Sequence, residues 1–169
     1  LGSNTTGASN VAVGTGSLNA NTTASNNTAM GHHALVANTT GGSNTAVGAY
    51  ALDANTTGTN NTGLGRQSLG ANTTASNNTG IGYNCLIANT TGTQNTAVGA
   101  LALDANTTAN NSVAVGYRAS TASTTGDNNV AIGVNAMLSN TTGDRNVAIG
   151  SSAMETYNVT DDGDDYNVA

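Results

Sequence analysis

The sequence is built from a 17-residue unit that recurs without gaps or insertions over most of the chain. Aligned copies begin at Asn4, Asn21, Asn38, Asn55, Asn72, Asn89, Asn106, Ser123 and Asn140. Fixed periods of about 20 residues are typical of solenoids, in which each repeat buries its apolar side chains only by stacking on its neighbours. The repeat therefore limits the fold more than any single residue does.

We number the unit from its Asn as column 1 and compare the nine copies column by column. Columns 2 and 3 are Thr and column 11 is Gly in every copy, while column 7 is Asn in all copies but one, where it is Ser112. Columns 8 to 10 hold Thr or Val, then Ala or Gly, then a large aliphatic residue, and column 15 is mostly Leu. This pattern predicts two short strands per unit, near columns 7–10 and 14–17, joined by a Gly turn and an Asn-Thr-Thr corner.

The predicted fold is all-β, a parallel β-solenoid of nine 17-residue coils, stacked about 4.8 Å apart. Stacking places each column above itself, so that Asn side chains hydrogen-bond from coil to coil. The repeat region covers residues 1–156. Residues 157–169 are expected to form a longer, irregular coil with an acidic loop that continues beyond this segment, because Asn167-Val-Ala169 restarts column 7 about four residues late.

The core expected from columns 10 and 15 is thin, because each coil supplies only two large aliphatic side chains. Column 9 is always Ala or Gly, so a surface packed against it would come very close. We therefore expect the first strand to face its own core on one side and a partner subunit on the other. The predicted oligomer interface is column 9: Ala12, Ala29, Ala46, Gly63, Gly80, Ala97, Ala114, Ala131 and Ala148.

Composition argues against several classes of partner. The chain has a net charge of -6, and its three cationic residues, Arg66, Arg118 and Arg145, are widely separated. Nucleic acid is not an expected partner, because neutralising phosphates requires clustered cations. No stretch approaches the ~20 apolar residues of a membrane span, so none is expected in this segment.

Few side chains suggest a chemical site, and we expect neither a cofactor nor a catalytic residue. The weak candidates for a metal are four carboxylates that could hold Ca²⁺, although a plain acidic loop fits their spacing better: Asp161, Asp162, Asp164 and Asp165. His32 and His33 are interpreted as solvated turn residues. Sequons for N-glycosylation occur at column 1, where a ladder role is favoured, and at five further positions: Asn26, Asn60, Asn77, Asn110 and Asn158.

Strand openings such as Ser112-Val-Ala-Val-Gly116 and Asn129-Val-Ala-Ile-Gly133 resemble the head repeats of YadA-like trimeric autotransporter adhesins. The whole unit, as in Asn89–Ala105, is also similar to repeats of phage tail-fibre proteins. The resemblance covers residues 1–156 and implies a left-handed β-roll assembled as a parallel homotrimer, outside the cell, on its surface or on a virion.

The function expected from these observations is that of a non-enzymatic structural or adhesive rod. It would form the shaft or head of an extracellular fibre, such as a surface adhesin, a filament or a phage tail fibre, and contact a host receptor or surface glycan. The alternative is an ice-binding or glycan-decorated surface β-solenoid. Ice binding is suggested by the regular Thr columns, of which only one faces outward because adjacent residues alternate.

Overall fold

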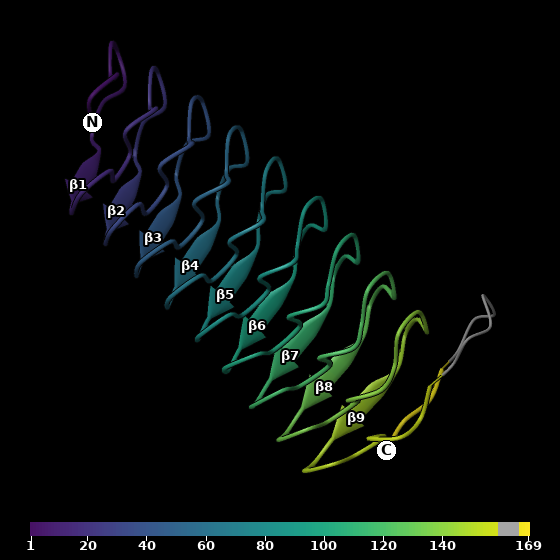
Figure 1. The fold of residues 1–169 in the computed structure, drawn as a ribbon. Helices are drawn as coiled ribbons and strands as arrows, with labels where there is room; N and C mark the ends of the chain where they lie inside the picture. Colours follow the sequence, from purple (N-terminus) through teal and green to yellow (C-terminus); the bar gives the residue numbers. More distant parts are fainter. Residues whose placement is uncertain (159–165) are drawn as a thin grey trace.

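The computed structural model describes residues 1–158 and 166–169, and it confirms the parallel β-solenoid with 17-residue spacing. Each unit contributes one three-residue strand at columns 8 to 10, and the strands lie side by side along one face of an elongated stack (Figure 1). They pair in chain order: β1 (Val11–Val13), β2 (Thr28–Met30), β3 (Thr45–Val47), β4 (Thr62–Leu64), β5 (Thr79–Ile81), β6 (Thr96–Val98), β7 (Val113–Val115), β8 (Val130–Ile132) and β9 (Val147–Ile149).

The pairing register places every column directly above itself. Thr45 of β3 pairs with Thr62 of β4, and Ala46 pairs with Gly63. The same parallel register is found in all eight strand pairs. Units of equal length make this register possible, because each coil returns to the sheet at the same point of the ladder.

The second strand predicted at columns 14–17 was wrong, because these residues form turns. The backbone is left-handed at column 13 and again at column 15, as at Tyr50 (φ 59°) and Leu52 (φ 51°). Two such residues, separated by a single residue, prevent an extended strand. Backbone hydrogen bonds still join this wall from coil to coil, for example from the Leu52 amide to the Ser68 carbonyl at 3.0 Å.

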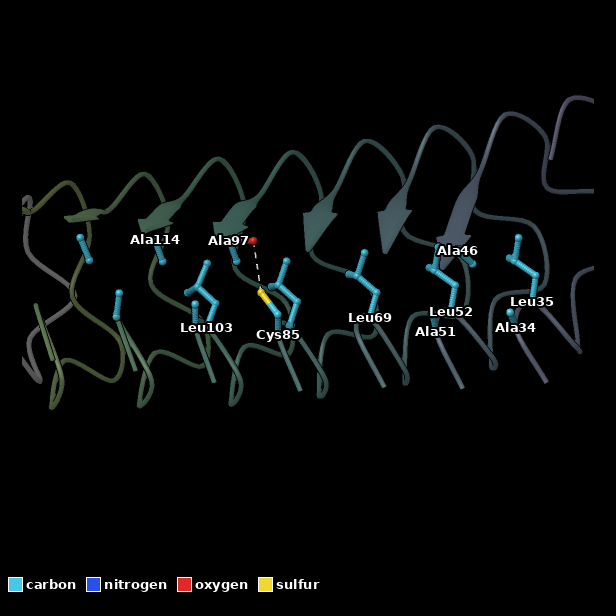
Figure 2. Close-up of a cluster of buried hydrophobic side chains, with 14 of the residues drawn as sticks. Ala34, Leu35, Ala46, Ala51, Leu52, Leu69, Cys85, Ala97, Leu103 and Ala114 are labelled. Atoms are coloured by element: carbon cyan, nitrogen blue, oxygen red, sulfur yellow. Dashed lines mark hydrogen bonds between the residues drawn. The ribbon is translucent and has the colours of Figure 1, made fainter. Parts of the chain in front are cut away.

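The core consists of columns 9, 14 and 15, whose side chains lie in rows inside the stack (Figure 2). Leu35, Leu52 and Leu103 are fully buried at column 15, opposite small residues of columns 9 and 14. The prediction that column 10 supplies half of the core was therefore wrong. Each coil supplies two small residues and one residue of column 15, which is Leu in six units, Met in two and Ser120 in one. The core is therefore thin because only column 15 supplies large side chains.

Asparagine ladders hold the coils together at two corners. At column 1 the Asn72 amide donates to Asn55 Oδ1 at 2.9 Å and to the Ala75 carbonyl at 3.0 Å. At column 7 the Asn61 side chain accepts from the backbone amide of Asn78 at 3.0 Å and donates to the Ala75 carbonyl at 2.8 Å. Both columns are buried, and their amides take the hydrogen bonds that water would otherwise supply.

The Gly of column 11 ends each strand with a positive φ between 116° and 143°. It also lies close to the next coil: a Cβ added at Gly82 would stand 2.5 Å from the carbonyl oxygen of Gly99. Both the conformation and the close approach exclude other residues here, as the column pattern suggested.

The last described residues return to the sheet after a longer excursion. Val168 bridges Val147 of β9 in parallel, and Asn167 donates to Asn146 Oδ1 at 2.9 Å across a separation of 21 residues. Asn167 and Val168 thus stand at columns 7 and 8 of a coil that is four residues longer than the others.

Candidate interaction surfaces

The structure places the predicted oligomer interface inside the chain's own core, and the prediction is corrected accordingly. Ala12 is partly buried, and the rest of column 9, Ala29, Ala46, Gly63, Gly80, Ala97, Ala114, Ala131 and Ala148, is buried in the single chain. The physical reason is the column 15 Leu of the preceding coil: a Cβ added at Gly63 would lie 3.3 Å from Leu52 Cγ. Only a small residue fits opposite that Leu, so smallness marks the inward side of the strand.

The outward side of the sheet carries columns 8 and 10, which we call the outer stripe. Column 8 holds Thr or Val and column 10 holds large aliphatic side chains, with no charged residue in any of the nine units. Val13, Leu64 and Ile149 are 53%, 44% and 60% exposed. Column 10 consists of Val13, Met30, Val47, Leu64, Ile81, Val98, Val115, Ile132 and Ile149.

The two adjacent Thr columns have different roles. At column 2 the Thr56 hydroxyl donates to the Thr73 carbonyl of the next coil at 3.1 Å, and the same bond recurs in most units. At column 3 the Thr is exposed in every unit. We call this exposed series the Thr rank: Thr6, Thr23, Thr40, Thr57, Thr74, Thr91, Thr108, Thr125 and Thr142.

The Asn of the column 1 sequons is unsuited to carry a glycan. Asn38 and most of its equivalents are fully buried, and the Nδ2 atom of Asn38 already donates two hydrogen bonds. The additional sequons differ among themselves. Asn26, Asn60 and Asn77 lie exposed at column 6 with φ near 60°.

The other two additional sequons are engaged through their side chains. Asn110 is half-buried and accepts from the Thr93 hydroxyl at 2.9 Å. Asn158 is exposed, and its Oδ1 accepts from the Thr141 backbone amide at 3.1 Å.

Columns 12 and 13 form a third surface, which we call the aromatic edge. His32 and His33 stack at 4.1 Å between ring centroids, and Tyr50 of the next unit meets both rings edge-on at 5.1 and 5.6 Å. One unit further, the Arg66 guanidinium lies 5.7 Å from the centre of the Tyr83 ring. The two His therefore occupy turn positions, as expected, but they belong to a row of stacked groups.

The titratable groups give little sign of a chemical site. Burial raises the pKa of the Cys85 thiol to about 12, and its Sγ donates to the Ala97 carbonyl at 3.2 Å. Burial also raises the pKa of the Asp53 carboxyl, against the opposing effects of backbone hydrogen bonds and of His33. Asp161, Asp162, Asp164 and Asp165 lie outside the described residues. Within residues 1–158 and 166–169, no group of three or more His, Cys, Asp or Glu is placed to hold a metal ion.

Sequence reasoning missed the outer stripe and the aromatic edge. The strand itself carried the signal for the outer stripe. Its column 9 face holds only Ala or Gly and must therefore be the closely packed inner face, which leaves columns 8 and 10 on the outside. The signal for the second was the restriction of His and of three of the five Tyr to columns 12 and 13.

No protein-family model, curated protein or solved structure matches the chain significantly. In the part of the chain that the structure describes, no helix is long and apolar enough to cross a membrane.

Proposed function

We propose that this protein is a non-enzymatic structural rod of an extracellular fibre, which assembles with further copies of itself through the outer stripe. The observation that carries the proposal is the row of nine large apolar side chains at column 10, of which six are exposed and Val47, Ile81 and Val98 are partly buried. Exposed apolar surfaces of this extent mark interaction sites, because leaving them in water is unfavourable.

A second copy of the same chain is the occupant that fits the outer stripe best. The stripe is uncharged and repeats with every coil, so a parallel copy presents the same residues at the same heights. Burying one large aliphatic per coil on each copy contributes about 1–2 kcal/mol, which accumulates along the rod. The resemblance to trimeric adhesin heads supports three copies around a common axis, and a location on a cell surface or virion.

The adhesive part of the proposal rests on the same regularity. A rigid stack presents each surface column many times along its length, so weak contacts to a receptor or glycan add up. The variable turn columns are the positions at which such contacts would differ from one rod to another.

Light scattering after size-exclusion chromatography tests the assembly. The wild-type chain is expected to elute with about three times the 16.5 kDa mass of one chain. Replacing Leu64 and Ile81 with Thr keeps a strand-forming residue but removes apolar contact, and it is expected to shift the protein towards monomer. Val134→Thr is the matched control, because Val134 is exposed at column 12, away from the stripe. A wild-type monomer at all concentrations would contradict the proposal.

Ice binding is the second candidate, favoured by the Thr rank. Every member of the rank is Thr, although the exposed column 6 and the mostly exposed column 12 vary, and the coils repeat at the strand spacing of about 4.8 Å. This candidate predicts thermal hysteresis that disappears when Thr74 and Thr91 are replaced with Tyr and that persists in Gln94→Tyr at column 6. Absence of hysteresis in the wild-type protein rules it out.

A further inference from the structure

The aromatic edge concentrates nearly all the rings of a chain that has few. The sequence contains five Tyr, two His and no Phe or Trp. Five of these seven rings occupy columns 12 and 13, at His32, His33, Tyr50, Tyr83 and Tyr117. None of them is in the core, and Tyr83 and Tyr117 are 47% and 50% exposed. Large rings gathered on the surface, outside the core, indicate a binding surface.

The rings support one another along the rod axis. The stacked pair of His32 and His33, the edge-on Tyr50, and the Arg66–Tyr83 pair follow each other over four consecutive units. A side chain that is already held by neighbours loses little freedom when a ligand binds. The part of the edge from His32 to Tyr83 is therefore preorganised.

The spacing of the rings fits a linear polymer with a repeating unit. Tyr83 and Tyr117 occupy the same column two coils apart, which is about 9.6 Å at the usual strand spacing. Tyr50 lies two coils before Tyr83, at the neighbouring column. This interval is comparable with the length of a disaccharide in an extended glycan chain, whose C–H faces pack against aromatic rings. No enclosed pocket occurs among the described residues, so the ligand would lie along the surface.

The charges beside the rings balance. Along the stretch of units that contains the rings, Arg66 and Arg118 stand at columns 12 and 13, and Asp53 and Asp104 stand at column 16. A third acid at column 16, Glu155, lies two units beyond Tyr117. Columns 13 and 16 lie close together at the turn. The hydroxyl of Thr121, a column 16 residue, donates to the carbonyl of Leu101 at column 13 (2.7 Å) and to Asp104 Oδ1 at column 16 (2.8 Å). A balanced edge on a chain of net charge -6 favours a neutral ligand over a polyanion.

We infer that the aromatic edge binds a neutral, linear polysaccharide lying parallel to the rod axis, with Tyr83 and Tyr117 stacking on sugars one disaccharide apart. This inference rests on the proposed adhesive role and specifies the ligand to which the rod attaches. The surface is complete within one chain and does not require assembly.

Affinity electrophoresis through gels containing hydroxyethylcellulose, xyloglucan, galactomannan or dextran tests the inference, with polygalacturonate and a single-stranded oligonucleotide as acidic comparators. We expect retardation by at least one neutral polymer and none by the acidic ones. Tyr83→Ala with Tyr117→Ala is expected to weaken that binding by about tenfold or more. Thr74→Ala, at the exposed column 3 outside the aromatic edge, should leave it unchanged. Circular dichroism of each variant establishes that it is folded.

Three outcomes would overturn the inference: no retardation by any neutral polymer, equal binding by the double variant when it is folded, or stronger retardation by an acidic comparator. The test is separate from that of the proposed assembly. A monomer that binds the glycan contradicts the assembly alone, whereas an assembled rod that binds none contradicts this inference alone.

Discussion

At the residue scale, the Asn of column 1 serves three partners in three coils. Asn72 donates to Asn55 Oδ1 and to the Ala75 carbonyl, and its own Oδ1 accepts from Asn89 at 3.0 Å. Replacing it with Ala leaves buried groups of two neighbouring coils with fewer partners. We expect Asn72→Ala to lower the free energy of unfolding by about 2–4 kcal/mol, measured by urea denaturation.

The matched control is Thr74→Ala, two positions away at the exposed column 3. Its expected effect is within about 0.5 kcal/mol, as for most surface substitutions. Equal losses in the two variants would show that the ladder contributes no more than any exposed side chain does.

Cys85 provides a second prediction at this scale. The thiol is fully buried, and its pKa of about 12 leaves almost no thiolate at neutral pH. Because the thiolate is the reactive form, we expect native protein to resist a thiol reagent such as DTNB at pH 8 and to react fully in denaturant. Comparable rates in both conditions would mean that this coil opens readily.

At the scale of the structural element, the Gly of column 11 is expected to be irreplaceable. Gly82→Ala would combine a φ of 139° with a Cβ contact of 2.5 Å to the next coil. We expect a loss of about 3 kcal/mol or more, or failure to fold, seen by thermal denaturation. Gly70→Ala is the control, since its Cβ would meet no atom closer than 3.3 Å and column 16 carries larger residues in other units. Similar melting temperatures for the two variants would contradict this account of the turn.

Two serines interrupt the Leu column and the column 1 Asn ladder at one place in the stack. Ser120 replaces Leu at column 15, and Ser123 replaces Asn at column 1. The Oγ atoms of both, and Oδ1 of Asn106 in the coil before, are buried without a hydrogen-bond partner. In the next unit the equivalent side chains, Met137 and Asn140, contact each other at 3.7 Å. These coils therefore lack ladder hydrogen bonds that Asn forms at column 1 elsewhere in the stack.

Completing the ladder at this place should stabilise the rod. Ser123→Asn supplies a donor to Asn106 Oδ1 and an acceptor for Asn140, and we expect it to raise the free energy of unfolding by about 1–2 kcal/mol. Ser151→Asn, at an exposed turn, is expected to change nothing. A destabilised Ser123→Asn variant would mean that the neighbouring coils have settled around the smaller side chain.

The sequence predicted those elements that depend on the period alone. Equal 17-residue units imply stacked coils. The Asn columns imply side-chain ladders, and the Gly column implies turns with positive φ. The structure contains all three features. The orientation of the strand was predicted wrongly because its core neighbour, Leu52 in the case of Gly63, comes from another coil. The second strand was predicted wrongly because a left-handed Leu leaves no signal in the sequence, non-Gly residues rarely adopting that conformation.

The candidate surfaces were harder to predict than the fold. Whether column 3 or column 2 faces water depends on which Thr hydroxyl reaches the next coil, and the sequence repeats both equally. The aromatic edge depends on rings from successive units meeting across coils, as His33 and Tyr50 do. Such contacts follow from the stacked geometry and not from the spacing of residues within one unit.

At the scale of the whole molecule, the stack turns each column into a continuous surface. The outer stripe, the Thr rank and the aromatic edge all run along the rod, on different columns of the same coils. The Thr rank and the aromatic edge are not part of the outer stripe, so an assembly through the stripe would leave both of these surfaces outside the interface. One chain can thus combine a surface for assembly with a surface for attachment.

The central claim is that the outer stripe of one copy faces the same stripe of its neighbours, in parallel and in register. Cysteine cross-linking tests it, with Val115→Cys introduced into a Cys85→Ser background; Ser already occupies column 14 at Ser68, where its Oγ donates to the Gly80 carbonyl at 2.8 Å. The account predicts that mild oxidation gives a covalent dimer through Cys at position 115, because a closed symmetric assembly brings the same stripe position of each copy to its axis. It predicts no dimer for Val134→Cys in the same background. Absence of cross-linking at 115, or equal cross-linking at both positions, would contradict it.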